Sequence, residues 1–396
     1  MKVLVLNAGS SSLKLRLFDL TGAASPARAL ARGAIERIGG QGTATFEAEG
    51  GPPRSETVEA PDHADAVQRA LDWVRSLGQG VIDAVGHRVV HGGERFTAPA
   101  RIDDEVVSAV EALEELAPLH NRPSLQAIGA CRRILGPSVP MVAVFDTAFH
   151  ATLPEHARRY AIPWDLASKH GIRRYGFHGT SYRSVLSRYA ELTGTPPARA
   201  TLVALHLGAG CSAAAIRAGQ SVDTSMGFTP LEGLVMGTRA GDLDPAIVSY
   251  LARAERASVD EVVQWLNERS GLLGISGRSR DVRDLASSDD PRARLAVQMF
   301  CYRARKYLGA YLAALGGASA VVFTGGIGEH SPEVRAEICR GMEWCGLAID
   351  GERNRAAVGR PAAIGAVGAR IGAFVIPTDE EIVIARDTVA LLEGTG

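Results

Sequence analysis

Short runs of hydrophobic residues recur along the chain, and each run stops at a cluster of glycine or polar residues. Apolar runs of about four to eight residues, bounded in this way, are typical of buried β-strands. The pattern predicts five such strands, at Lys2–Leu6, Val85–Val90, Val142–Phe145, Leu202–Leu207 and Ala320–Phe323.

Between these runs the apolar residues recur at helical spacing. Ala64–Leu77 and Asp104–Leu116 have this spacing. Asp244-Pro245 and Asp290-Pro291 each place a capping residue before a proline suited to the first helical position, and the second pair predicts a helix to about Leu315. Alternating strands and helices predict an α/β protein, in which ligands bind at the carboxyl ends of strands.

Two segments repeat one pattern of strand, glycine turn and strand. Val3–Ser11 and Ala204–Ser212 share Leu, Leu, Ala, Gly and Ser at a single offset. The repeat predicts two related lobes whose phosphate-sized turns lie at equivalent places and face a shared cleft. The length of 396 residues also favours two lobes, at about 150 residues per domain, with a boundary near residue 150.

The composition narrows the classes of partner. The 43 Lys and Arg nearly balance the 44 Asp and Glu, which argues against nucleic acid or an anionic membrane as the partner. The chain has five cysteines without C-x-x-C spacing, so we expect reduced thiols in a cytoplasmic protein. The apolar run at the N-terminus is too short for a signal sequence or a membrane span.

Arginines in glycine-rich loops are the first candidates for chemistry. Only four of the 43 basic residues are lysine. Most of the arginines fit a bias in base composition, but a guanidinium in a glycine loop can bind carboxylate or phosphate through two parallel hydrogen bonds. Arg88 leads into a Gly-Gly loop, and Arg239 lies between Gly237 and Gly241. We expect both to be anion-binding residues.

Other strand ends carry candidates with a simpler structural alternative. Asp146 follows an apolar run, where an aspartate either caps a helix or takes part in a metal or phosphoryl-transfer site. His178 precedes a helix for which Thr180 or Ser181 is the expected cap, and it is either an incidental loop residue or a functional one. The loop Thr324–Glu329 suits a nucleotide base or phosphate.

Three familiar motifs do not fit this chain. No lysine follows a glycine, which excludes a P-loop. Gly208-x-Gly210 matches part of a dinucleotide fingerprint, but the following run turns after four residues instead of opening a helix, so a hairpin phosphate loop is the better interpretation. His87 and His91 are four residues apart without an H-E-x-x-H motif, and we expect hydrogen-bonded histidines near a turn instead of a zinc site.

From Met1 to about Arg386 the chain resembles the acetate kinase family, which belongs to the actin-like, sugar-kinase-like ATPase superfamily. The segments that carry the resemblance are Asn7–Lys14, His87–Glu94, Ala117–Asn121, Phe145–His150, Gly176–Ser181, Met236–Pro245, Asp281–Asp284, Phe323–Glu329 and Pro377–Glu381. The resemblance implies an α/β fold of two actin-like, ribonuclease H-like lobes, each a mixed sheet with flanking helices, around a central cleft. Residues 1–150 with 382–396 would form one lobe, and residues 151–381 the nucleotide-binding lobe.

The implied activity is reversible transfer of the ATP γ-phosphoryl to acetate, giving acetyl phosphate and ADP. Mg²⁺ or Mn²⁺ would assist, and the protein would be a cytoplasmic homodimer. A propionate or butyrate kinase and a pyrophosphate-dependent acyl kinase are the alternatives within the class. A non-catalytic actin-like nucleotide-binding protein is an alternative of a different class, and a dehydrogenase rests on Gly208-x-Gly210 alone.

The resemblance also implies a role for each catalytic residue. Arg88 and Arg239 would grip the carboxylate and the migrating phosphoryl group. His178 would donate a hydrogen bond to that group, with His120 nearby, and Asp146 would order the metal or the attacking carboxylate. The implied metal residues are Asn7 and Glu380, and Lys14 would reach a phosphate.

Two further sets follow from the same resemblance. The acyl pocket would comprise Val90, Leu119, Phe177 and Pro230. The nucleotide contacts would comprise His206, Leu207, Gly208, Ala209, Gly210, Asp281, Val282, Arg283, Gly326, Ile327, Gly328, Glu329 and His330. The sequence departs from the family pattern at four positions, where Ala209 and His330 replace asparagine, Tyr182 replaces histidine and Ala240 replaces serine. Gly326 and Ile327 still leave room for adenine, so ATP is the expected donor.

Overall fold

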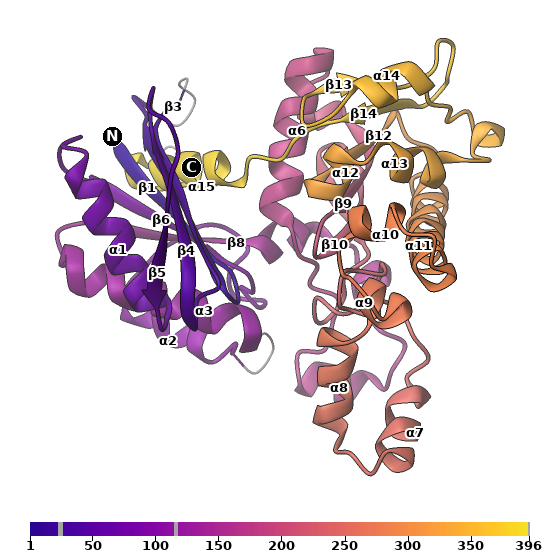
Figure 1. The fold of residues 1–396 in the computed structure, drawn as a ribbon, viewed down its shortest axis with the longest axis horizontal. Helices are drawn as coiled ribbons and strands as arrows, with labels where there is room; N and C mark the ends of the chain where they lie inside the picture. Colours follow the sequence, from indigo (N-terminus) through magenta and orange to yellow (C-terminus); the bar gives the residue numbers. More distant parts are fainter. Residues whose placement is uncertain (23–26, 115–117, 395–396) are drawn as a thin grey trace. The chain divides into compact units, whose positions relative to one another are not determined.

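The computed structural model describes residues 1–22, 27–114 and 118–394, and the side chains of 118–120 lie outside this description. The chain forms two compact units (Figure 1). Unit 1 comprises Met1–Phe149 and Asp379–Gly396, and unit 2 comprises His150–Thr378. We propose that these units are the two lobes, with boundaries one to three residues away from those expected.

Unit 1 is built on an eight-stranded mixed sheet with the strand order β5-β4-β3-β2-β1-β6-β8-β7. Its strands are β1 (Lys2–Ala8), β2 (Ser12–Asp19), β3 (Arg28–Glu36), β4 (Gly40–Ala48), β5 (Arg54–Ala60), β6 (Ala84–Val89), β7 (Ala100–Arg101) and β8 (Met141–Phe145). Strands β1 to β5 form an antiparallel meander, while β1, β6 and β8 are parallel neighbours. Parallel neighbours end at the same edge of the sheet, so their terminal side chains gather there.

Helices pack on both faces of this sheet. They are α1 (His63–Ser76), α2 (Asp104–Glu111), α3 (Pro118–Leu135) and α15 (Glu380–Glu393), and the last of them lies against β1, β6 and β8 (Figure 1). Leu4 and Leu6 join the core formed with α1 and α3, whereas Val3 and Val5 join the core formed with α15. Burial on both faces explains why β1 is a continuous hydrophobic run.

The helix expected at Asp104–Leu116 is shorter than expected. Asp103 caps α2 through a bond from the Val106 N–H, but the helix ends at Glu111. Helix α3 begins at Pro118, where its fixed backbone angle suits a first turn, and the strand pattern had not indicated this helix.

Unit 2 is built on a six-stranded sheet with the strand order β11-β10-β9-β12-β14-β13. Its strands are β9 (Thr201–Leu207), β10 (Cys211–Arg217), β11 (Gln220–Thr224), β12 (Ala320–Thr324), β13 (Ala362–Ala363) and β14 (Gly372–Val375). The hairpin β9–β10 is antiparallel and β12 runs parallel to β9, as β1–β2 and β6 do in unit 1. The repeated strand, turn and strand pattern is thereby confirmed.

Some helices of unit 2 lie against this sheet, and others extend away from it (Figure 1). They are α4 (Glu155–Arg158), α5 (Trp164–Lys169), α6 (Gly179–Thr193), α7 (Ala246–Ala254), α8 (Val259–Glu268), α9 (Gly271–Ser276), α10 (Val282–Ala286), α11 (Pro291–Leu315), α12 (Gly325–His330), α13 (Pro332–Cys339) and α14 (Gly351–Ala356). Helix α11 packs on β9 and β10. Its Asp290 cap and its closure at Gly316 are as the sequence predicts.

Two sequence expectations concern the chain as a whole. All five cysteines are buried and free in the structure. No helix in the described ranges combines the length and the apolar character needed to cross a membrane.

Candidate active-site residues in the two units

In unit 1, the carboxyl ends of the parallel strands β1, β6 and β8 bring together Asn7, Arg88 and Asp146. The Arg88 guanidinium donates to Asp146 Oδ2 through Nε at 3.1 Å and through Nη2 at 2.5 Å. Its Nη1 donates to Asn7 Oδ1 at 3.0 Å. The Asp146 side chain is fully buried, so Arg88 supplies the charge compensation that the sequence around Asp146 lacks.

Glu380 joins this cluster from the first turn of α15. Its Oε2 lies 3.7 Å from Arg88 Nε and accepts a bond from Asn7 Nδ2 at 3.4 Å. Burial, together with the charges of Asp146 and Glu381, raises the pKa of Glu380 to about 7 against the opposing effect of Arg88 and Lys14. Lys14 lies opposite Asn7 in the β1–β2 ladder.

The oxygen-rich character of this cluster fits a hard divalent cation. Three carboxylates, those of Asp146, Glu380 and Glu381, interact electrostatically with the two cations of Arg88 and Lys14. Within the described part of the chain, no three His, Cys, Asp or Glu side chains form a ready metal site. Mg²⁺ usually takes one or two carboxylates and completes its coordination with water and substrate phosphate, so the residues fit this ion.

In unit 2, His178 occupies the residue that leads into α6. Its backbone is left-handed with φ of 58°, an uncommon state for a residue other than glycine. The expectation that Thr180 or Ser181 caps the helix is wrong, because His178 itself stands at the cap position without a side-chain cap bond. Ser181 instead bonds Nδ1 of His206 at 2.8 Å, and the His206 ring stacks on the His178 ring at 4.1 Å.

The glycine turn between β9 and β10 lies against both His178 and Arg239. The turn is closed by a bond from Gly208 N to Gly210 O at 3.2 Å, which confirms a hairpin in place of a dinucleotide-binding helix start. A Cβ atom placed on Gly210 would lie 3.6 Å from His178 Nε2 and 3.8 Å from Arg239 Nη1. An imidazole and a guanidinium therefore converge on one phosphate-sized turn.

Arg239 lies in a loop that docks onto the same turn. Its Nη1 donates to the Pro230 carbonyl at 3.0 Å, and Gly237 N donates to the Ala209 carbonyl at 3.1 Å. Burial lowers the pKa of Arg239, and no ion pair joins its guanidinium to another described residue. A desolvated cation without a carboxylate partner is suited to an anionic ligand.

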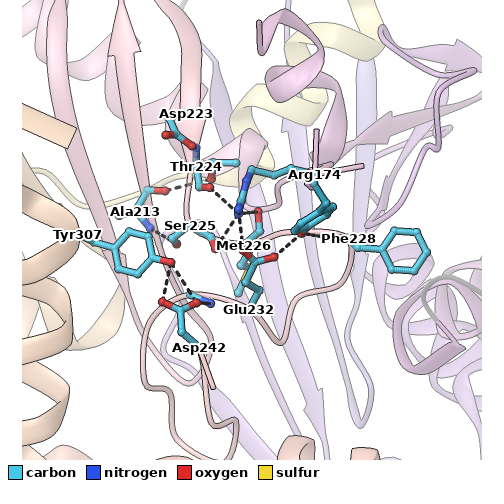
Figure 2. A network of polar contacts seen from close by, with 12 residues as sticks. Arg174, Ala213, Asp223, Thr224, Ser225, Met226, Phe228, Glu232, Asp242 and Tyr307 are labelled. Carbon is cyan, nitrogen blue, oxygen red and sulfur yellow. Dashed lines mark hydrogen bonds and ion pairs between the residues drawn. The ribbon is translucent and has the colours of Figure 1, made fainter. Parts of the chain in front are cut away.

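Two polar anchors hold the loop that carries Pro230 and Arg239 (Figure 2). At the first, Arg174 donates to the carbonyls of Thr224, Ser225 and Met226 and pairs with Glu232 at 2.6 Å. At the second, Asp242 accepts bonds from the Gly233 N–H at 2.8 Å and from the Tyr307 hydroxyl at 2.9 Å. The loop is thereby held on both sides of Arg239.

Replacing Glu232 with Gln is expected to lower the free energy of unfolding by about 1–3 kcal/mol, because it removes a charged partner of half-buried Arg174. Urea unfolding measures the change. The matched control is Glu155→Gln, whose carboxylate is 56% exposed and pairs with Arg159 on the surface; it should cost less than about 1 kcal/mol. Equal losses in the two variants would contradict the anchoring role.

The expected nucleotide contacts border the same turn. Gly325 has φ of 76°, and a Cβ there would meet the Leu207 carbonyl at 2.7 Å, so glycine lets α12 approach β9. Glu329 has a structural contact, since its Oε1 accepts bonds from the backbone N–H groups of Gly325 and Thr378. His330 bonds the Gly326 carbonyl through Nδ1 at 3.0 Å.

Asp281, Val282 and Arg283 form the start of α10. Asp281 caps the helix, and the exposed Arg283 guanidinium bonds its carboxylate. The Arg280 carbonyl lies 3.3 Å from a Cβ placed on Gly237, which brings this segment beside the loop of Arg239.

The apolar residues expected to line the acyl pocket are distributed over both units. Val90 is buried in unit 1, and Phe177 and Pro230 are buried in unit 2. Leu119 and His120 belong to α3, and their side chains lie outside the described residues.

His87 lies in β6, whereas His91 follows the end of this strand. Burial lowers the pKa of His87 to about 3, and its Nε2 has no hydrogen-bond partner among the described residues.

Sequence reasoning did not identify Ser212, Arg174 or Glu232. Ser212 is the second residue of β10 and bonds His178, and Arg174 and Glu232 anchor the loop of Arg239. The charged pair lies 58 residues apart in the chain, and no local pattern links its members. The one sequence signal that includes Ser212 is the partial repeat of the strand, turn and strand pattern.

Comparison with known proteins gives one consistent result. The model of the acetokinase family matches residues 2–386. The acetate kinase of Solibacter usitatus is 52% identical over 409 residues, which cover all of this chain and 99% of the relative. The acetate kinase of Methanosarcina thermophila is 47% identical, covering 99% of this chain and 97% of the relative.

Solved structures agree with these relatives. The acetate kinase of Porphyromonas gingivalis matches with a TM-score of 0.89 and 41% identity over 99% of each chain. A propionate kinase from Francisella tularensis matches with a TM-score of 0.90 and 38% identity over 98% of each chain. These matches confirm the predicted actin-like fold of two mixed sheets with flanking helices, and the chain belongs to the acetokinase family.

Proposed function

We propose that the protein catalyses reversible transfer of the ATP γ-phosphoryl group to acetate, giving acetyl phosphate and ADP. The observation that carries this proposal is the convergence of His178 and Arg239 on the β9–β10 turn, where Arg239 forms no ion pair with a described residue. Two cationic or hydrogen-donating groups at a glycine turn suit a phosphoryl group in transit. The names of its relatives support acetate as the acceptor.

The mechanism requires positioning more than proton transfer. Acetate is ionised near neutral pH, so its carboxylate oxygen can attack the γ-phosphorus without a general base. The bond to the β,γ-bridging oxygen breaks on the opposite side, and its electron pair leaves on ADP. Arg239 would neutralise charge on the phosphoryl oxygens, and His178 would donate a hydrogen bond to one of them through Nε2. Arg88 would hold the acetate carboxylate.

The unit 1 cluster would hold the metal. Asn7 and Glu380 would bind Mg²⁺ or Mn²⁺ directly or through water, and Asp146 would orient the ion or the attacking carboxylate. Such an ion, when bound, neutralises charge on the nucleotide phosphates. The Arg88 contacts to Asp146 and Asn7 hold these oxygen atoms at the strand ends. Lys14 would contact a phosphate.

The acyl pocket, the nucleotide contacts, the oligomeric state and the cellular location are also part of this proposal. Val90, Leu119, Phe177 and Pro230 would form the acyl pocket, and the segments around Gly208, Asp281 and Gly326 would contact the nucleotide. The family resemblance also supports a homodimer and a cytoplasmic location. Sedimentation equilibrium would test the first of these, since a monomer at micromolar concentration would contradict it.

We expect acyl phosphate, trapped as hydroxamate, to form from ATP and acetate and not from pyrophosphate and acetate. We also expect kcat/KM to be higher for acetate than for propionate or butyrate. One methylene changes discrimination by about 10- to 200-fold, so the acid series resolves the acceptor. Reactions without acid serve as the blank.

Each other outcome supports a named alternative. A higher kcat/KM for propionate would favour a propionate kinase, which the match to the Francisella tularensis structure keeps as the second candidate. Product from pyrophosphate would favour a pyrophosphate-dependent enzyme. ATP binding without any hydroxamate would favour a non-catalytic nucleotide-binding protein.

A further inference from the structure

Three side chains of unit 2 form a polar chain that ends on His178. Tyr182 from the first turn of α6 and Ser212 from β10 are both fully buried. The Tyr182 hydroxyl lies 2.5 Å from Ser212 Oγ, and Ser212 Oγ lies 2.8 Å from Nδ1 of His178. The serine hydroxyl therefore stands between a phenol and an imidazole.

The function proposed for His178 sets the direction of these bonds. Donation from Nε2 needs the ring hydrogen on that atom, so Nδ1 must accept the bond from Ser212 Oγ. Because a serine hydroxyl has one hydrogen, a serine that donates to Nδ1 can only accept from the Tyr182 hydroxyl. Burial raises the pKa of Tyr182, so the phenol keeps the hydrogen that this bond requires.

We propose that Tyr182 and Ser212 are positioning residues that hold the neutral His178 ring with Nδ1 as a hydrogen-bond acceptor and its hydrogen on Nε2. Nε2 is the nitrogen beside the Gly210 turn, 3.6 Å from a Cβ placed there. A hydrogen on this atom is what donation to a phosphoryl oxygen requires, so the inference rests on the proposed use of His178. The chain thereby decides which nitrogen of His178 can serve the reaction.

The groups around His178 favour a neutral ring. Arg239 brings its guanidinium to the same turn from the loop, and the His206 ring from β9 stacks on His178 at 4.1 Å. Cys211 from β10 is buried, and burial raises the pKa of its thiol, so it carries no negative charge to offset a cation. A second positive charge on His178 would be repelled by Arg239. The neutral ring then needs a fixed tautomer, which the two hydroxyls supply.

The direct test is a long-range ¹H–¹⁵N spectrum of the full-length protein with ¹⁵N-labelled histidine rings. The spectrum of His178→Gln assigns the His178 signals by their loss. In the wild type we expect a protonated Nε2 and an unprotonated Nδ1. In Tyr182→Phe the serine hydroxyl can either donate or accept, so the two nitrogen shifts should move toward each other.

Kinetics supply the second measurement. Tyr182→Phe removes one oxygen from a buried site without creating a large cavity, and kcat should fall about tenfold while KM for acetate and ATP stays within about twofold. The matched control is Tyr189→Phe, which removes a phenol hydroxyl from the same helix and should leave kcat and the His178 signals unchanged. Ser212→Ala, if it folds, should reproduce the changes in Tyr182→Phe.

Two results would overturn the proposal: a hydrogen on Nδ1 in the wild type, or His178 signals and kcat in Tyr182→Phe that match those of Tyr189→Phe. The spectrum is read on the resting protein and does not depend on turnover. The expected tautomer together with no acyl phosphate from the wild type would contradict the proposed function and leave the positioning role standing.

Discussion

Replacing Arg239 with Ala is expected to lower kcat by roughly 10³-fold or more while the protein stays folded. An arginine that stabilises charge on a transferring phosphoryl group contributes an effect of about this size. Arg239 forms no ion pair with a described residue, so its truncation leaves no buried carboxylate without a partner. Steady-state hydroxamate assays measure kcat, and thermal unfolding verifies the fold.

The control for Arg239→Ala is Arg253→Ala, which removes an exposed guanidinium from α7 of the same unit. It should change kcat by less than twofold. A loss below tenfold in Arg239→Ala would remove this residue from the mechanism. Arg239→Lys keeps a positive charge but lacks the parallel N–H donors of a guanidinium. We expect it to recover only part of the activity.

Replacing Arg88 with Ala is expected to abolish most activity and also to lower the free energy of unfolding by about 3–5 kcal/mol. The second effect follows because the fully buried Asp146 would lose the cation that compensates its charge. Glu380 would lose the same cation. Chemical unfolding and the hydroxamate assay measure the two effects on the same preparation.

A double variant separates folding from function at this site. Arg88→Met with Asp146→Leu removes both charges of the ion pair and keeps similar volumes, so much of the lost stability should return although Glu380 still lacks the Arg88 cation. Activity should not return, because the double variant lacks both the guanidinium that would bind the acetate carboxylate and the Asp146 oxygen atoms. Recovery of activity along with stability would show that the pair serves the fold alone.

The elements with local signals could be predicted from the sequence. The apolar runs ending at glycine or polar residues correspond to β1, β6, β8, β9 and β12. Asp290 and Gly316 mark the ends of α11 because a cap and a left-handed glycine act within one helical turn. The repeat likewise predicts the hairpins β1–β2 and β9–β10, whose turns connect adjacent segments.

Elements that depend on distant contacts were predicted less well. Helix α2 ends at Glu111 although the apolar spacing continues beyond it, and α3 starts at Pro118, where no helix was predicted. At α6, Thr180 and Ser181 have the side chains of caps, but Ser181 bonds His206 from β9. A partner in another strand overrides the local capping preference there.

The sequence by itself determined the α/β class, the glycine turns and the presence of Arg88 and Arg239 in loops at strand ends. Only the tertiary structure decided the partners of these groups. Asp146 meets Arg88 from 58 positions away, and Glu380 meets Asn7 from 373 positions away. The physical reason is that strand and turn signals act over a few residues, whereas these pairs depend on the order β1-β6-β8 and on α15 packing beside it.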